Sequence, residues 1–163
     1  MASILNVDQI NNAAGTSGIA LDASTGKASF PNGATLPAGS VVQVVSTTKT
    51  DVFSTSVGAG SASSIITGLT ASITPSATSS IILVHFMVDC GQQSVYLTLC
   101  ENGSAITAAT GDAAGSSQRV TATRDFTYST FYNQSIAGTF VHSPASASAL
   151  TYGIKLSHSS SAT

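Results

Sequence analysis

The sequence is short of charged residues. Only 7% of its 163 residues are Asp, Glu, Lys or Arg, whereas a typical soluble domain carries about 25%. Ser, Ala and Thr are the commonest side chains instead. A neutral surface rich in hydroxyl groups suits the outer faces of β-strands and surfaces that are covered in an assembly. The shortage of charge therefore favours a β protein that forms homo-oligomers.

Three further absences exclude other classes of protein. The five basic residues are scattered and the net charge is −2, so the chain carries no basic patch for nucleic acid. No apolar run reaches the length of about 20 residues that spans a bilayer, which argues against membrane insertion. The first residues lack the positive and apolar regions of a secretion signal. We therefore expect a chain that folds in a cytoplasm and has no nucleic-acid partner.

Cysteine and histidine are too few and too widely spaced to predict a metal site. Cys90 and Cys100 are the only cysteines; a disulfide is compatible with their spacing, but we favour two buried thiols in a reducing compartment. His85, His142 and His158 lack the spacing of metal ligands. We interpret His85 as a hydrogen-bonded core or interface residue. A ring of three His85 copies around a trimer axis is the remaining option for an ion.

Catalytic signatures are also missing. Glycoside hydrolysis needs two carboxyl groups about 5–10 Å apart, and only Asp89 and Glu101, at the ends of a predicted hairpin, offer such a pair. We favour the alternative that both accept backbone N–H groups at strand ends. The sequence has no G-x-S-x-G motif, and no Gly-rich loop joins a strand to a helix. We therefore expect no catalytic residue, no metal and no cofactor, and we predict that the protein is not an enzyme.

Residues 1–36 are predicted to form an arm rather than a domain. Residues 4–10 are compatible with a strand or a single helical turn. Residues 19–22 and 27–31 flank an Ala-Ser-Thr-Gly turn, which predicts a hairpin with Gly26 at the position that needs a positive φ. An isolated hairpin is marginally stable in water. Such an arm becomes ordered only against its own copies or a partner, which favours a role in attachment over one in catalysis.

Residues 37–163 are predicted to form an all-β domain, after a Pro-Ala-Gly hinge. About eight strands without a helical period predict an antiparallel sandwich, jelly-roll or barrel. One candidate strand is apolar on both faces, which predicts a central strand, and another alternates, which predicts a half-buried strand. The strand that is apolar on both faces is residues 80–89, and the alternating strand is residues 94–101. The other candidate strands are residues 41–47, 64–73, 119–123, 126–132, 136–142 and 149–157.

A cluster of aromatic residues is the best candidate for a binding surface. Aromatic rings beside hydroxyl groups stack on sugar rings or fill an interface. We prefer packing within the domain or between subunits, and contact with a glycan is the alternative. The cluster consists of Phe126, Tyr128, Phe131 and Tyr132, next to Arg124.

Several phrases of the sequence, taken in order, resemble fibre proteins of tailed bacteriophages. Residues 21–27 (LDASTGK), followed by Phe30 and Pro31, resemble a linker that is common in tail-fibre and related virion sequences. Residues 70–84 (TASITPSATSSIILV) are similar to a segment of small β domains in fibre proteins of marine and cyanobacterial phages. Residues 111–119 and 143–152 resemble two further phrases of the same group.

The resemblance implies a homotrimeric virion fibre with an N-terminal arm docked on the neck, tail or capsid and a β domain that projects outward. The alternative is that the β domain itself binds host surface polysaccharide. Ile81 and His142 depart from the residues common in the group, so no contact is carried over there. Members usually continue beyond the strand at Tyr152, so this chain is either a shorter variant or lacks a final strand. The apolar side chains of the arm are then the candidates for virion attachment: Ile4, Leu5, Val7, Ile10, Ile19, Leu21 and Phe30.

Overall fold

The computed structural model describes residues 9–11, 14–15, 17–30, 39–58, 61–91, 94–112, 114–115, 118–124 and 133–158. This part of the chain is all-β and built from antiparallel sheets, and its helical structure is limited to one 3₁₀ turn, Thr107–Ala109. The chain divides into two compact units, residues 1–44 and 45–163. The boundary predicted between residues 36 and 37 falls at a stretch outside the described residues, and it stays a prediction.

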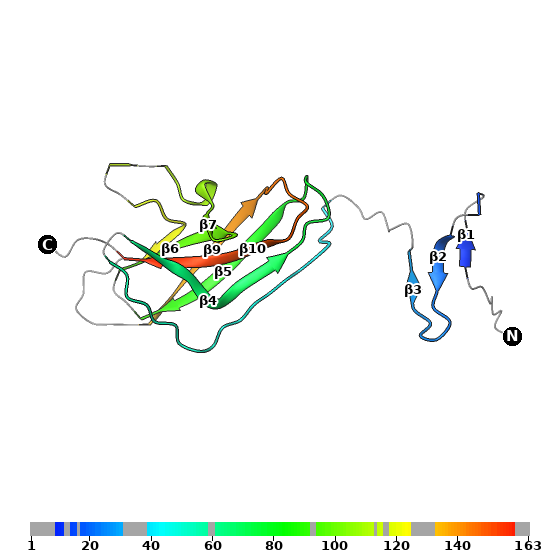
Figure 1. Ribbon diagram of the computed structural model, residues 1–163, viewed down its shortest axis with the longest axis horizontal. Coiled ribbons are helices and arrows are strands. Elements are labelled where there is room, and N and C mark those ends of the chain that lie inside the picture. Colours follow the sequence, from blue (N-terminus) through cyan, green and yellow to red (C-terminus); the bar gives the residue numbers. More distant parts are fainter. Residues whose placement is uncertain are drawn as a thin grey trace. The chain divides into compact units, whose positions relative to one another are not determined.

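The first unit contains three short strands, β1 (Gln9–Asn11), β2 (Ser17–Leu21) and β3 (Ala28–Ser29), in the order β1-β2-β3 (Figure 1). β2 and β3 form the predicted hairpin, and Gly26 has the expected positive φ, 66°. Ile10 lies in a strand rather than a helical turn. No side chain described in this unit is buried, so the part of it that the structure describes has no core.

Asp22 organises the turn between β2 and β3. Its Oδ1 accepts hydrogen bonds from the Thr25 hydroxyl and backbone N–H, both at 2.7 Å, and from the Ser24 hydroxyl at 2.8 Å. The Gly26 N–H also donates to the Asp22 carbonyl, at 2.8 Å. An Asp side chain that bonds the backbone ahead of it is a common turn former. Because these donors, Thr25 first, favour the charged carboxylate, they lower the pKa of Asp22 to about 2.

We expect Thr25→Ala to return the pKa of Asp22 from about 2 toward the ordinary 3.8. Since the pKa is depressed in the folded turn, the stabilisation of the turn is complete above pH 3.8 and is lost as the pH falls through 2. An NMR titration of the carboxyl resonance measures the shift. Ser29→Ala is the control, because the Ser29 hydroxyl donates to the Ala20 carbonyl instead. An unchanged pKa in Thr25→Ala would contradict the assignment.

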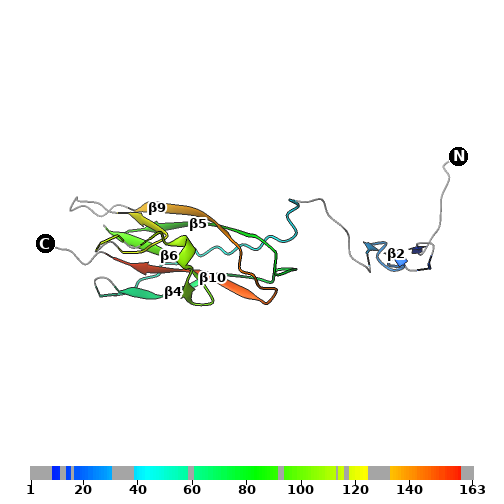
Figure 2. The same cartoon turned by 90° about the horizontal axis from the view of Figure 1, so that it is seen from above.

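The second unit contains two antiparallel sheets that face each other as layers, as Figure 2 shows. The larger sheet has the order β4-β10-β6-β7, and β8 also pairs with β6. The smaller sheet pairs β5 with β9 over nine residues of each strand. The strands are β4 (Ala62–Ile73), β5 (Ile82–Cys90), β6 (Val95–Glu101), β7 (Ser104–Ala105), β8 (Ala122–Arg124), β9 (Gln134–His142) and β10 (Leu150–Ser157).

The core of this unit lies between the two sheets. Leu97 and Leu99 of β6 are 0% and 1% exposed, and they cluster with Ile154 of β10 and with Ile82 and Ile136 of the smaller sheet. Successive side chains of a strand point to opposite faces, so alternate residues of each strand reach this layer. A fully buried aliphatic side chain contributes about 1.5–3 kcal/mol. The contact between the sheets is therefore what stabilises the unit.

Most of the predicted strands are confirmed. Residues 64–73, 80–89, 94–101, 136–142 and 149–157 correspond to β4, β5, β6, β9 and β10. The strand predicted at 119–123 begins later, as β8, and the strand predicted at 126–132 lies outside the described residues.

The prediction of a strand at residues 41–47 is wrong. No strand occurs in residues 39–58, and Val41, Val42 and Val44 are exposed. β-Branched residues favour an extended backbone, but a strand also needs a partner that completes its ladder of hydrogen bonds. In the described part of the chain, no backbone hydrogen bond joins residues 41–47 to a strand; the Thr47 hydroxyl alone donates to the Thr70 carbonyl, at 2.7 Å.

The predicted roles of β5 and β6 in their sheets are also wrong. β5 was expected to be central and β6 half-buried, and the structure shows the reverse. β6 is the strand with neighbours on both sides, and Thr98 and Cys100, on the face opposite Leu97, are buried as well. Within the described residues β5 pairs with β9 alone, and Leu83 and Met87 on its outer side are exposed. An apolar pattern on both faces predicts a central strand only where other elements of the same chain cover both faces.

Candidate functional site

The apolar residues predicted for virion attachment lie in the first unit. Ile10, Leu21 and Phe30 are 53%, 42% and 51% exposed, and Ile19 is half-buried. Ile4, Leu5 and Val7 lie outside the described residues. The structure therefore presents three of the seven candidates as exposed apolar side chains on or beside a small sheet.

The aromatic cluster predicted as a glycan or interface contact stays a prediction. Its four aromatic residues lie outside the described residues: Phe126, Tyr128, Phe131 and Tyr132. Arg124, beside them in the sequence, ends β8 and is half-buried. Its Nη1 donates to the Cys90 carbonyl at 3.0 Å. Arg124 thus links the end of β8 in the larger sheet to the end of β5 in the smaller one.

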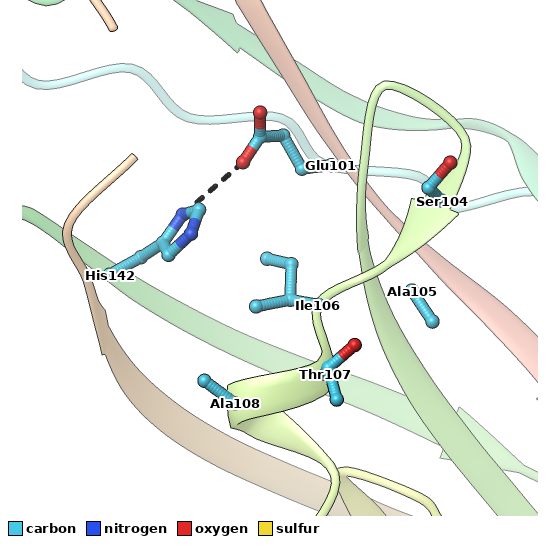
Figure 3. A pocket seen from close by; sticks show the side chains of 7 residues that line it. All are labelled: Glu101, Ser104, Ala105, Ile106, Thr107, Ala108 and His142. Atoms are coloured by element: carbon cyan, nitrogen blue, oxygen red, sulfur yellow. Dashed lines mark ion pairs between the residues drawn. The ribbon is translucent and has the colours of Figure 1, made fainter. Parts of the chain in front are cut away.

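A hollow of about 360 Å³ opens at one end of the second unit. Glu101 at the end of β6 and His142 at the end of β9 face each other there (Figure 3). Ile106 lies between the β7 strand and the 3₁₀ turn, which together form the other wall. The hollow therefore lies where the ends of the two sheets and the β7 segment meet.

A polar triad of Glu101, His142 and Tyr152 spans the two sheets at this hollow. The Nδ1 atom of His142 is 2.8 Å from the Tyr152 hydroxyl and 3.5 Å from Oε2 of Glu101. The rings of His142 and Tyr152 meet edge to face, with centroids 5.8 Å apart. Tyr152 lies opposite Glu101 in the β10–β6 register, so the ladder itself brings these two side chains to the same face.

Burial, and then the neighbouring Glu101 carboxylate, raise the pKa of Tyr152 to about 12. The Tyr152 hydroxyl therefore stays protonated over a wider pH range than usual, and the tautomer of the His142 ring decides which of the two groups donates in their hydrogen bond. The hollow thus offers a carboxylate, an imidazole and the side chains of Ser104 and Thr107 beside the apolar Ile106. This set can hydrogen-bond a polyhydroxyl ligand.

Sequence reasoning missed this triad. In the sequence, Glu101 is a candidate only together with Asp89, and His142 is one of three histidines without the spacing of metal ligands and a departure from the fibre phrases. The three residues lie 41 and 10 positions apart, so no local motif marks them. The signal that brings Glu101 and Tyr152 together is the strand register, which becomes visible only when the sheet is assembled.

The structure separates the two carboxylates that were considered for glycosidase chemistry. Glu101 lies beside His142, which is opposite Ile82 at the start of β5, whereas Asp89 is seven residues further along β5 and accepts a hydrogen bond from Ser135. Seven residues of strand span about 23 Å. That separation is well beyond the about 5–10 Å that two such carboxyl groups need, so the idea that they approach each other is wrong.

The remaining candidate ligands are also dispersed. The described residues contain no group of three or more His, Cys, Asp or Glu side chains that could hold a metal ion. Nδ1 of His85 is 2.9 Å from the Thr139 hydroxyl, and Nε2 of His158 is 2.7 Å from the Val57 carbonyl. Cys90 and Cys100 are free and buried, as favoured from the sequence, and burial raises the pKa of both thiols.

Among the described residues, no helix has the length and apolar character needed to cross a membrane. None of the protein-family models matches the sequence, and no curated protein or solved structure proved similar to the chain.

Proposed function

We propose that the protein is a non-enzymatic structural component of a tailed-phage virion, a homotrimeric tail, neck or head fibre. Residues 1–36 attach it to neck, tail or capsid proteins, and residues 37–163 form a jelly-roll-like domain of about eight strands that aids attachment to the host. The fibre-like phrases of the sequence motivate this proposal. The observation that carries it is the contrast between the two units.

The first unit has the composition of a docking segment. It contains a three-stranded sheet, yet none of its described side chains is buried, and Ile10, Leu21 and Phe30 are about half exposed. The second unit holds the whole described core. A small sheet that carries apolar side chains without a core gains order when a partner covers them. This is what an attachment arm requires.

Deletion of residues 1–36 should abolish incorporation into virions and leave the second unit folded, since the core that the described residues form contains none before residue 53. Full-length protein with Ile10→Ser, Leu21→Ser and Phe30→Ser should be incorporated about 100-fold less well, because burial of three such half-exposed side chains contributes about 3 kcal/mol. Quantitative immunoblots of purified particles measure incorporation. Circular dichroism and a cooperative thermal transition establish that the truncated protein is folded.

Asn11→Ser combined with Lys27→Ser is the matched control, because it changes two exposed polar residues of the same unit. We expect this variant to enter virions at the wild-type level. Virions that retain the truncated protein at full occupancy would contradict the attachment role of residues 1–36.

A second candidate function, recognition of host carbohydrate by the second unit, is favoured by the hollow at Glu101 and His142. Its carboxylate, imidazole and hydroxyl groups suit the hydrogen bonds of a sugar. The truncated protein discriminates between the two functions, because a carbohydrate-binding domain should compete with phage for host cells and a passive fibre should not. Glu101→Gln should then remove the competition.

A further inference from the structure

The outer face of the β5–β9 sheet is apolar. The register pairs Leu83 with Val141, His85 with Thr139 and Met87 with Ala137, so these six side chains share the face that points away from the core. Leu83, Met87 and Val141 are 66%, 64% and 59% exposed. The inner face of the same two strands, by contrast, supplies Ile82 and Ile136 to the core.

Charge is nearly absent from this face. All residues of both strands are described, and the one carboxylate at the outward positions is Asp89, at the end of the face, where it accepts a hydrogen bond from Ser135. At the centre, His85 is already hydrogen-bonded to Thr139 through Nδ1. The polar groups of the face therefore lie at its margin or already have a hydrogen-bond partner. This lowers the free-energy cost of removing the face from water.

The larger sheet shows that the apolar character is particular to the β5–β9 face. Its outward positions carry Ser72 and Thr151, which hydrogen-bond each other at 2.9 Å, and the half-buried Lys155, whereas Thr98 and Cys100 on the same face are buried. A sheet with one solvated face typically places polar residues on that face. The larger sheet follows this rule where its outer face is accessible to solvent, at Ser72 and Thr151, whereas the β5–β9 sheet leaves the apolar side chains of Leu83, Met87 and Val141 exposed.

We propose that the outer face of the β5–β9 sheet packs against the same face of other copies of this chain. A contact between identical faces sets like charges against each other, and such contacts are costly. The long central part of this face carries no Asp, Glu, Lys or Arg, so a second copy of the chain can cover it without that cost. This partner also agrees with the low overall charge of 7%.

The dimensions of the face are compatible with this partner. Two nine-residue strands cover a face about 30 Å long and about 10 Å wide, or about 300 Å². A standard interface buries about 800 Å² on each partner. The face therefore forms the apolar centre of an interface, and the surface around it supplies the rim.

The inference deepens the proposed function and rests on it only for the number of copies, because the same face can pair in a dimer or surround a three-fold axis. The two ideas can fail separately. Loss of virion incorporation in the truncated protein tests the arm, while the oligomeric state of purified full-length protein tests the face.

The first test introduces charge into the face. Leu83→Lys and Met87→Lys should each raise the dissociation constant of the oligomer by more than about 100-fold, because every copy then sets a cation against another cation. Sedimentation velocity at micromolar concentrations measures the mass, and circular dichroism checks the fold. Val52→Lys is the control, since Val52 is 91% exposed and lies outside both strands; it should sediment as the wild type.

A second test does not depend on how well the lysine variants fold. Leu83→Cys should be cross-linked between copies by a short bis-maleimide, whereas Val52→Cys should not. The native thiols interfere little, because both are buried. Wild-type protein that sediments as a monomer, lysine variants that keep the wild-type mass, or cross-linking that is equal at positions 83 and 52 would each overturn the proposal. Association with a lipid vesicle or an unrelated protein in place of self-association would do the same.

Discussion

Leu99→Ala should lower the free energy of unfolding by about 2–5 kcal/mol, the range for truncation of a buried leucine. Leu99 is 1% exposed and lies on the inner face of β6, opposite Ile154 of β10. The substitution removes apolar contacts and leaves a cavity between two sheets that are held by their own ladders and can collapse only partly. Such a loss is a large share of the 5–15 kcal/mol that typically stabilises a domain.

Urea denaturation followed by circular dichroism measures this loss as a lower midpoint with an unchanged slope. All variants are compared at one protein concentration, because self-association adds to apparent stability. Val52→Ala also shortens an aliphatic side chain, but at an exposed position, and should change the free energy of unfolding by no more than about 0.5 kcal/mol. An equal effect of the two substitutions would show that the core does not lie between the sheets.

Gly138→Val should destabilise the second unit by about 1–3 kcal/mol, as overpacking of a filled core does. Gly138 lies opposite Phe86 in the β5–β9 register, and a Cβ atom added at Gly138 would lie 2.5 Å from Cζ of the phenylalanine ring. Real side chains do not approach so closely, so the ring must move. Because Phe86 packs against the core cluster, its displacement disturbs the contact between the sheets.

A double-mutant cycle separates this clash from the general preference of strands against glycine. Gly138→Ala should cost less in a Phe86→Leu background than in the wild type, because the shorter side chain leaves room for the added methyl group. The expected coupling free energy is about 1 kcal/mol. Additive effects of the two substitutions would mean that the ring does not occupy the space above Gly138.

The sequence predicted local features well because their causes are local. The Asp22–Gly26 turn follows from an Asp that bonds the backbone ahead of it and a glycine that accepts a positive φ. The strands at β4, β9 and β10 follow from β-branched runs that end at Gly, Pro or Ser. None of these features needs information from distant residues.

The wrong predictions concern which strands pair with each other, and this depends on residues far apart in the chain. Within the described residues, 41–47 have strand composition but no partner strand, and β5 has the composition of a central strand but pairs with β9 alone. The triad of Glu101, His142 and Tyr152 is of the same kind, because it depends on which strands become neighbours. The composition of a strand indicates how apolar it is, and it does not indicate which other elements cover it.

The amino-acid sequence by itself determined an all-β protein with little charge, a turn at Asp22–Gly26 and most of its strands, since backbone preferences and hydrophobic alternation act over a few residues. The tertiary structure decided that β6 is central, that β5 presents Leu83 and Met87 outward, and that Glu101 meets His142. Hydrogen-bond ladders join residues far apart in the chain, and only the assembled sheets fix which strands are neighbours and which face stays uncovered.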